Sequence, residues 1–490
     1  MSFDFPYILY IGILFLLNPA HLNAQGGNEQ ELAVPVALHP DIKVEHVMGV
    51  GPQAVRILYK PNNGDFYYTT FDGDVFQIKD ITGEQPAYEK VFSARDHGIT
   101  RLQGAAFLGN TLFLAGNISV NDNKGTKGRM VRYEMDPSGN HPMTEVFNTV
   151  EIGSTKTTFD HGFNGMAISP DGKYIYVNSG ARTDHGEVQD NGGEYPNSRD
   201  EALTACIFRF PIDAKDLLLP NDEEKLVADG YLYVKGIRNA YDLAFDSEGQ
   251  LFAVSNSGDY DHPEDMFWIR QGHHYGFPWV MGGIENPQQY PDWNPDPETD
   301  PFISKFAHAW LMRYFRNDPG FPQRPEGVAF TPAVQNIGPD ANEYRDRATG
   351  MVMDGDTTGA TVGTFNAHSS PLGLFFDTEK ILSDEFKGDG FVIRYAGGRR
   401  RRSSAPPNPL RAQGKDLLHL ELKYDKATDN YTVRTTRIVE GFTGPTDAVM
   451  VGNKVYIIEY GGQGGNLWKI TLPQDTKQSR SQQKKSADSH

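Results

Sequence analysis

Two adjacent residues, Asp160 and His161, are the strongest candidates for chemistry in this sequence. They stand directly before Phe163-Asn-Gly-Met-Ala-Ile168, a segment with the composition of a short β-strand. Histidine is the side chain whose ordinary pKa lies nearest neutrality, so His161 is suited to take a proton from a substrate. The carboxylate of Asp160 could orient the imidazole or hold the substrate. The structural alternative is that His161 only caps the turn before the strand.

The segment after His161 is one copy of a loose repeat. Each copy is a short apolar strand, a Gly or Asn turn and an aromatic or β-branched strand, a pattern typical of β-hairpins. A further amphipathic strand follows most copies, so the sequence predicts an all-β fold, a six-bladed β-propeller. The six copies contain Ile57, Ala105, Met166, Leu243, Leu372 and Ala448 in their first strands.

A propeller explains how residues far apart in the sequence share a site. The inner strand of each blade lines a central channel, so residues just before the hairpins converge at one mouth of that channel. Asp160 and His161 precede one hairpin, and Arg238 and Asn239 precede the next. We therefore expect these four side chains to lie together.

The charge balance and the cysteine content exclude several classes of function. The 490 residues include 46 Lys and Arg against 64 Asp and Glu, a net charge of −18. Nucleic acids and anionic membrane surfaces need a basic face, so neither is expected as the main partner. A single cysteine, Cys206, permits no intramolecular disulfide and no cysteine zinc site.

Both ends of the chain differ from the repeat region. An apolar run from Tyr7 to Leu17 and a small-residue cleavage pattern ending at Ala24 predict a signal peptide over 1–24, although Asp4 stands where basic residues are usual. No later apolar stretch has the length of a membrane span, so the mature chain is expected to be exported, either periplasmic or secreted. The remaining domain predictions are a lead-in over 25–48, the propeller over 49–472 and a polar, disordered tail over 473–490.

Four ordered motifs resemble those of the soluble quinoprotein glucose and sorbosone dehydrogenases. The match covers roughly residues 49–472, and the order and spacing of the motifs make it specific. The resemblance implies a six-bladed propeller that holds pyrroloquinoline quinone (PQQ) and Ca²⁺ over the channel and oxidises sugars. The motifs are Asp160-His-Gly-Phe-Asn-Gly-Met through Gly172, Gly236-Ile-Arg-Asn-Ala-Tyr-Asp-Leu-Ala-Phe-Asp246, Asn256 through Pro278, and Ala367-His-Ser-Ser-Pro-Leu-Gly with Phe386-Lys-Gly-Asp389.

The resemblance also implies roles for individual residues. His161 would be the catalytic base, and Asp160 and Gln103 would lie beside the substrate. Gly258 and Asp259 match the position where the family offers main-chain oxygens to calcium, a hard cation that takes oxygen ligands. A solvated loop is the alternative for this acidic segment.

The cofactor contacts implied by the resemblance are Arg238, Asn239, His368 and Arg394. PQQ is a flat tricarboxylate, so a planar guanidinium and amide donors suit its pocket. A rim salt bridge and a turn-forming asparagine are the alternatives for Arg238 and Asn239. The family's arginines on the last blade and its cofactor-binding lysine have no match here, and the nearby cations are Arg394 and the run Arg399–Arg402.

A long segment rich in proline and aromatic residues, about 277–366, interrupts the repeat. Proline removes the donors of a strand ladder, so this insertion is not expected to add a regular sheet. It is either a decorative insertion packed outside the propeller or a cap over a channel mouth. As a cap it would offer Trp279, Trp293 and Trp310 for stacking on a sugar ring.

The sequence thus predicts an exported, PQQ- and calcium-dependent dehydrogenase that oxidises a sugar or a sugar-like alcohol or aldehyde. His161 would assist hydride transfer to the quinone, and electrons would leave to an external acceptor that the sequence does not identify. Two alternatives remain open, since a fold does not determine a function. One is a non-catalytic glycan- or protein-binding propeller. The other is a calcium-dependent lactonase-type propeller with side-chain carboxylates at the channel centre.

Overall fold

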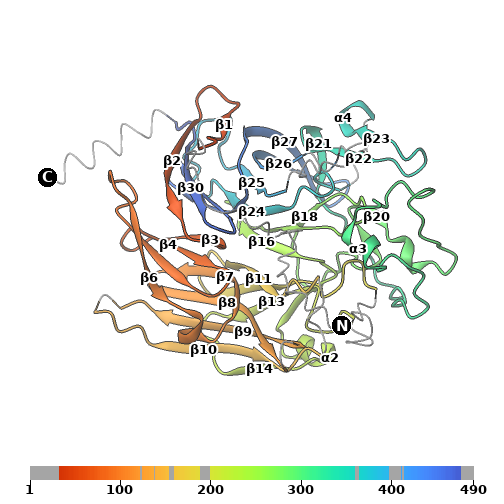
Figure 1. The fold of residues 1–490 in the computed structure, drawn as a ribbon, viewed down its shortest axis with the longest axis horizontal. Helices are drawn as coiled ribbons and strands as arrows, with labels where there is room; N and C mark the ends of the chain where they lie inside the picture. Colours follow the sequence, from red (N-terminus) through yellow and green to blue (C-terminus); the bar gives the residue numbers. More distant parts are fainter. Residues whose placement is uncertain are drawn as a thin grey trace, which may run out of the picture.

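The computed structural model describes residues 32–121, 124–136, 138–153, 159–187, 199–358, 363–396, 410 and 413–475 (Figure 1). The predicted signal peptide, the run Arg399–Arg402 and the tail beyond residue 475 lie outside these ranges.

Six antiparallel sheets form the blades of a β-propeller, which confirms the predicted fold. Blade one contains β3 (Ala54–Lys60), β4 (Asp65–Thr70), β5 (Val75–Lys79) and β6 (Ala87–Phe92). Blade two contains β7 (Arg101–Leu108), β8 (Thr111–Val120), β9 (Gly125–Glu134) and β10 (Met143–Thr149), with β14 (Leu217–Leu219) parallel to β10. Blade three contains β11 (Phe163–Ile168), β12 (Tyr174–Ser179), β13 (Cys206–Pro211) and β15 (Leu232–Lys235).

The second half of the chain forms the other three blades. Blade four contains β16 (Ala240–Phe245), β17 (Leu251–Ser255) and β18 (Asp265–Trp268). Blade five contains β24 (Pro371–Phe376), β25 (Gly390–Arg394), β26 (Asp416–Asp425) and β27 (Asn430–Glu440), with β1 (Val36–Ala37) and β21 (Gln335–Pro339) paired to β27. Blade six contains β28 (Pro445–Val451), β29 (Lys454–Glu459), β30 (Gly465–Thr471) and β2 (Lys43–Val50). The short helices are α1 (Ala94–His97), α2 (Glu223–Ala228), α3 (His308–Leu311) and α4 (Gly355–Thr358). None of the helices found in the described ranges is long and apolar enough to cross a membrane.

The six inner strands form a closed ring around the channel. In chain order β3, β7, β11, β16, β24 and β28 each contact the next, and β28 contacts β3. The ring is fastened where β2, from the start of the described chain, pairs antiparallel with β30 from its end (Figure 1). The propeller therefore begins before residue 49, and part of the segment assigned as a lead-in is the outer strand of blade six.

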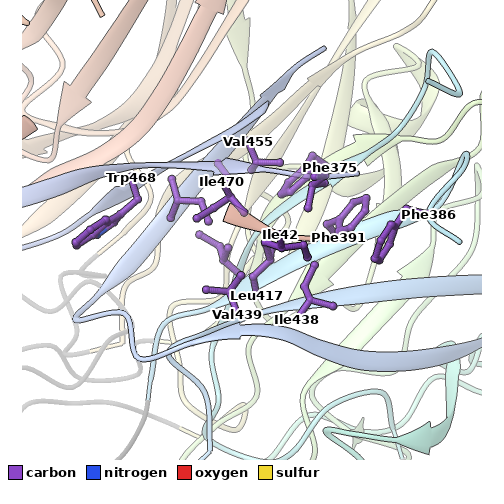
Figure 2. Close-up of a cluster of buried hydrophobic side chains, with 14 of the residues drawn as sticks. Ile42, Phe375, Phe386, Phe391, Leu417, Ile438, Val439, Val455, Trp468 and Ile470 are labelled. Atoms are coloured by element: carbon purple, nitrogen blue, oxygen red, sulfur yellow. The ribbon is translucent and has the colours of Figure 1, made fainter. Parts of the chain in front are cut away.

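Apolar side chains between neighbouring blades hold the ring together. Figure 2 shows one such cluster, in which Phe391 and Leu417 of blade five pack with Val455 and Trp468 of blade six. Ile42, which precedes β2, joins the same cluster and helps to fix the N-terminal segment. Burying each large apolar side chain contributes about 1.5–3 kcal/mol, so packing between blades is a main source of stability.

The insertion lies beside blades four and five (at the right of Figure 1, around α3 and β20). Its short elements are β19 (Val280–Met281), β20 (Ile284–Glu285), the 3₁₀ helix η2 (Pro287–Gln289), α3, β21, β22 (Glu343–Arg345), β23 (Val352–Asp354) and α4. Contrary to the expectation from its prolines, one segment does join a blade, because β21 pairs in parallel with the edge strand β27. Pro339, the last residue of β21, stands at that edge, where a missing donor is tolerated.

Candidate functional site

Three inner strands are joined by a buried ion-pair network of one arginine and two carboxylates, which lines a cavity of about 210 Å³. Arg56, on β3, places Nη1 3.3 Å from Asp242 Oδ1 on β16 and 3.2 Å from Asp447 Oδ1 on β28. Its Nε donates to the carbonyl of Gln103 at 2.7 Å, and its guanidinium lies over the Tyr241 ring, 4.3 Å from the centroid. Burial raises the pKa of Asp242 to about 7, against the opposing effect of Arg56. One guanidinium thus ties three blades together at the axis.

Asp160 lies beside two arginines in the loop before β11. Arg101 Nη1 is 2.9 Å from Asp160 Oδ2, and Arg182 Nε is 2.7 Å from Asp160 Oδ1. All three residues are buried. The carboxylate therefore anchors the start of β7 and the loop after β12 to the loop that carries His161. Among the described contacts no hydrogen bond joins it to the imidazole.

His161 is held in a single tautomer with one ring nitrogen unused. Its Nδ1 lies 2.9 Å from the carbonyl of Ala181, which can only accept, so Nδ1 carries the proton. Nε2 is buried, and no group in the described ranges forms a hydrogen bond with it. Burial, with added repulsion from Arg238 and Arg182, lowers the pKa of His161 to about 3. The ring is therefore neutral near physiological pH, with a lone pair on Nε2.

Arg238 and Asn239 meet His161 at Gly180. A Cβ built on Gly180 would lie 2.6 Å from His161 Cβ, 2.9 Å from Asn239 Oδ1 and 3.4 Å from the carbonyl of Arg238. Only a glycine lets these loops approach so closely. The structure thus brings His161, Arg238 and Asn239 together, as the propeller geometry predicted.

The Arg238 guanidinium is already engaged by protein groups. Its Nε donates to the carbonyl of Asp184 at 2.9 Å, its Nη2 to Asp184 Oδ1 at 2.8 Å, and its Nη1 to the carbonyl of Asn256 at 3.0 Å. The other oxygen of Asp184 lies 2.7 Å from His185 Nδ1. We call the buried group Asp160, His161, Asp184, Arg238 and Asn239 the mouth site.

His368 belongs to a second buried network that borders the mouth site. Its Nε2 is 2.6 Å from Asp261 Oδ1, and Arg345 approaches Asp261 Oδ2 to 2.8 Å. In the same region Glu264 accepts from the backbone amides of Ser257 at 2.6 Å and Ser370 at 3.3 Å. Burial raises the pKa of Glu264 to about 7. His368 therefore fastens the loop before β24 to the acidic loop after β17.

Arg394 has no open face toward a ligand. Its Nε and Nη2 lie 2.9 and 2.6 Å from the two oxygens of Asp416, and its Nη1 donates to Asn366 Oδ1 at 2.8 Å. Both members of the ion pair are fully buried. The role of Arg394 suggested by the sequence, as a substitute cation for a cofactor, does not suit this position, because the whole guanidinium serves blade five.

The predicted calcium residues lie next to the mouth site. Asp259 donates its amide to Asp184 Oδ2 at 3.1 Å, while its carboxylate accepts from the Ala309 amide of the insertion at 2.8 Å. A Cβ on Gly258 would lie 2.7 Å from His185 Nε2. In the part of the chain that the structure describes, no three His, Cys, Asp or Glu side chains form a group that could hold a metal ion. Calcium here would depend on main-chain oxygens.

Gln103 completes the set of predicted site residues. It lies on β7, is buried, and its side-chain Oε1 has no hydrogen-bond partner. Sequence reasoning missed Asp184 and His185, which follow β12 in the stretch Ala181-Arg-Thr-Asp-His-Gly-Glu187. The signal was available, because charged residues directly after an apolar strand reach the same mouth as residues before the neighbouring hairpin.

The mouth region fits a flat, polar cofactor such as PQQ in two respects. Buried polar atoms without partners are His161 Nε2, Gln103 Oε1, Asn256 Oδ1 and Tyr241 Oη. An aromatic surface stands around the channel, formed by Phe71 and Tyr241 with Tyr395 and Tyr460 packed against them. Unpartnered atoms of this kind are costly unless a ligand or water satisfies them. The fit is weaker in charge, since Arg238 would have to share its guanidinium between Asp184 and a cofactor carboxylate.

Comparison with known proteins gives similarity at the level of the fold. No protein-family model matches the sequence, and neither does any curated protein. The soluble aldose sugar dehydrogenase of Escherichia coli in its apo form superposes with a TM-score of 0.52 at 13% identity, covering 88% of this chain and 99% of that one. The PQQ domain of pyranose dehydrogenase from Coprinopsis cinerea, in its holo form, gives 0.52 at 13% identity, covering 90% and 98%. A glucose dehydrogenase gives 0.52 at 12% identity, covering 87% and 99%. The chain therefore has the propeller fold of soluble sugar dehydrogenases, in agreement with the resemblance of its motifs.

Proposed function

We propose that this chain is a quinone-dependent oxidoreductase that oxidises a sugar or a sugar-like alcohol or aldehyde at the mouth site. The observation that carries the proposal is the free Nε2 of His161, a buried lone pair at the channel mouth of a propeller with the sugar dehydrogenase fold. Oxidation of a hydroxyl-bearing carbon removes a proton from the oxygen and a hydride from the carbon. The residues of this chain account for the proton.

His161 is suited to accept the hydroxyl proton on Nε2. The hydrogen bond from Nδ1 to Ala181 fixes the ring, so the lone pair needs no reorientation before reaction. Its low pKa makes His161 a weak base that cannot hold a proton for long beside Arg238 and Arg182. We infer that the proton passes on to solvent or product once the hydride has left.

PQQ, when bound, would supply the quinone carbon that accepts the hydride. Arg238 and Asn239 would hold it from the side of His161, and the aromatic cluster around Tyr241 would support its flat face. The main-chain oxygens of Gly258 and Asp259 are the proposed calcium ligands. Asp160 and Gln103 are proposed to lie at the substrate side, with Asp160 acting chiefly by anchoring the loop of His161 through Arg101 and Arg182.

Aromatic side chains of the insertion contact loops next to the mouth site. The Phe315 ring lies 4.6 Å from the His185 ring, and Phe302 stacks on Tyr260 at 5.0 Å. Apolar cover of this kind keeps water away from a hydride-transfer site. Of the two interpretations of the insertion, the cap is therefore the one we propose.

The lactonase-type alternative is disfavoured by the channel centre. A metal held there would need the carboxylates of Asp242 and Asp447 as ligands. Arg56 already occupies this position and neutralises both. The glycan-binding alternative is favoured by one observation, the pairing of Arg238 with Asp184, which leaves less positive charge for a tricarboxylate.

We also propose that the mature chain is exported, because the sequence predicts a signal peptide over residues 1–24.

The test is reconstitution of the purified chain with PQQ and Ca²⁺, followed by optical titration with a panel of aldoses. We expect saturable PQQ binding and sugar-dependent reduction, with reduction lost in His161→Ala but kept in the control His46→Ala on blade six. Absence of PQQ binding at micromolar concentration would contradict the proposal and leave the glycan-binding alternative. Unchanged reduction in His161→Ala would remove His161 as the base.

A further inference from the structure

A cavity lies on the insertion and is lined by none of the mouth-site residues. Its volume is about 540 Å³, within the range of roughly 300–1,000 Å³ of small-molecule sites. The insertion cavity is lined by Asn294, Pro295, Trp310, Leu311, Arg313, Phe315, Arg316 and Asn317.

The insertion cavity carries arginines in an otherwise acidic chain. The sequence has a net charge of −18, yet among the described residues two arginines and no carboxylate line this cavity. Arg313 is exposed, and within the described ranges no side chain forms an ion pair with it. A free guanidinium is a strong ligand for planar anions, because its fork of N–H groups matches two oxygens of a carboxylate.

The backbone holds Arg313 in an unusual conformation. Its φ is 61°, in the left-handed region, just after α3 ends at Leu311 and Met312. Glycine is the residue that normally follows a helix in this conformation. The left-handed backbone at Arg313 turns the chain at the cavity wall, where its side chain is one of the lining groups.

The neutral groups of the cavity have the chemistry that recognises sugars. Trp310 and Phe315 offer aromatic surfaces for the C–H face of a pyranose ring, and Asn294 and Asn317 offer amides for its hydroxyls. Phe315 also packs against His185, the neighbour of Asp184 in the mouth site.

We propose that the insertion cavity binds an acidic saccharide, with its carboxylate on Arg313 and a sugar ring on Trp310. This site goes beyond the proposed oxidation and does not depend on it, since binding here involves neither PQQ nor His161. It assigns the insertion a recognition role in addition to its cover of the mouth site.

The test is calorimetric titration of the full chain, without PQQ, using three probes: digalacturonate, a sulfated disaccharide and neutral maltose. We expect digalacturonate to bind and maltose to bind at least tenfold more weakly, with an affinity for digalacturonate that falls as salt is added. Absence of digalacturonate binding at millimolar concentration, or equal binding of maltose, would overturn the proposal. Tighter binding of the sulfated probe would overturn its assignment to a carboxylate.

Variants separate recognition from folding. Arg313→Gly suits the left-handed backbone, so it should keep or raise the melting temperature while it lowers digalacturonate affinity about tenfold, the effect of losing one charged hydrogen bond. Lys305→Gln, an exposed cation of the same insertion outside the cavity, is the matched control and should leave affinity unchanged. Since Trp310 also packs in the insertion, Trp310→Phe is preferred to alanine, and unchanged affinity in both Arg313→Gly and Trp310→Phe would refute the site.

Discussion

The arginines at the mouth site and in the insertion cavity differ in burial and in pairing. At the mouth, Arg238 is buried against Asp184, and Arg182 against Asp160. In the insertion cavity, Arg313 is exposed and no carboxylate is among the lining residues. The difference follows from solvent, because a buried charge without a partner is costly whereas water can stabilise an exposed one.

The two regions suit ligands of different charge. The mouth site has its charges paired and leaves the neutral lone pair of His161 Nε2 to meet a ligand. The insertion cavity leaves positive charge for the ligand to neutralise. A neutral sugar therefore suits the first region, and an anionic one suits the second.

The largest expected effect comes from breaking a buried ion pair in blade five. Asp416→Ala leaves Arg394 fully buried without its carboxylate and also removes the partner of Arg437. We expect a loss of about 3–5 kcal/mol in the free energy of unfolding, measured by urea denaturation. An effect no larger than that of Glu298→Ala, which breaks the exposed pair with Lys305, would show that burial does not set the cost.

Closing the space at Gly180 should separate the mouth-site loops. Gly180→Ala places a methyl group against His161 Cβ and Asn239 Oδ1, so one of these loops must move. Because a displacement of about 1 Å can cost a hundredfold in rate, we expect sugar oxidation to fall by about that factor. Gly462→Ala, at a position with open space, is the control for activity. Equal activity of both variants would mean that contact between these loops is not needed.

Buried carboxyl groups give the stability of the core a pH dependence. Burial raises the pKa of Asp265 to about 7, above its value in the unfolded chain. Between these pKa values the folded state holds the extra proton, so the contribution of Asp265 to stability is lost as pH rises toward 7. We expect Asp265→Asn to raise the free energy of unfolding by about 1 kcal/mol or more at pH 8, relative to its effect at pH 4. A difference that does not change between pH 4 and 8 would contradict this assignment.

The smallest effect is expected on the outside of the insertion. Arg324 and Glu285 form an ion pair at 3.1 Å with both side chains well exposed. Arg324→Gln should leave the melting temperature and digalacturonate binding almost unchanged, because exposed pairs contribute little. A large loss of stability would show that the insertion depends on surface charge rather than on the aromatic cluster around Phe302 and Phe315.

The fold was predictable from the sequence because its repeat is local. Each hairpin can be recognised from alternating apolar and polar residues on both sides of a turn, and six such hairpins already indicate the propeller. The strand that closes the ring, β2, was not predicted. It pairs with β30 from the opposite end of the chain, and no sequence pattern links the two segments. Pairing over such distances leaves no periodicity to detect.

The site was predictable in position more than in detail. His161, Arg238 and Asn239 do meet, as residues before neighbouring inner strands must. Which carboxylate neutralises which arginine could not be foreseen, because Asp184 and Asp416 lie at the ends of other strands and their partners are set by packing. The left-handed backbone of Arg313 also has no sequence signal, since glycine would have been expected there.

The pairing of β2 with β30 has a consequence for the order of assembly. Blade six cannot be completed until the last strand has been made, so β2 must wait for nearly all of the chain to leave the ribosome. Until then β2 has no strand to pair with, and contacts between distant parts of the sequence form slowly. A chain shortened before Gly465 would lack β30, and the ring would stay open with both β2 and β29 exposed as unpaired edges.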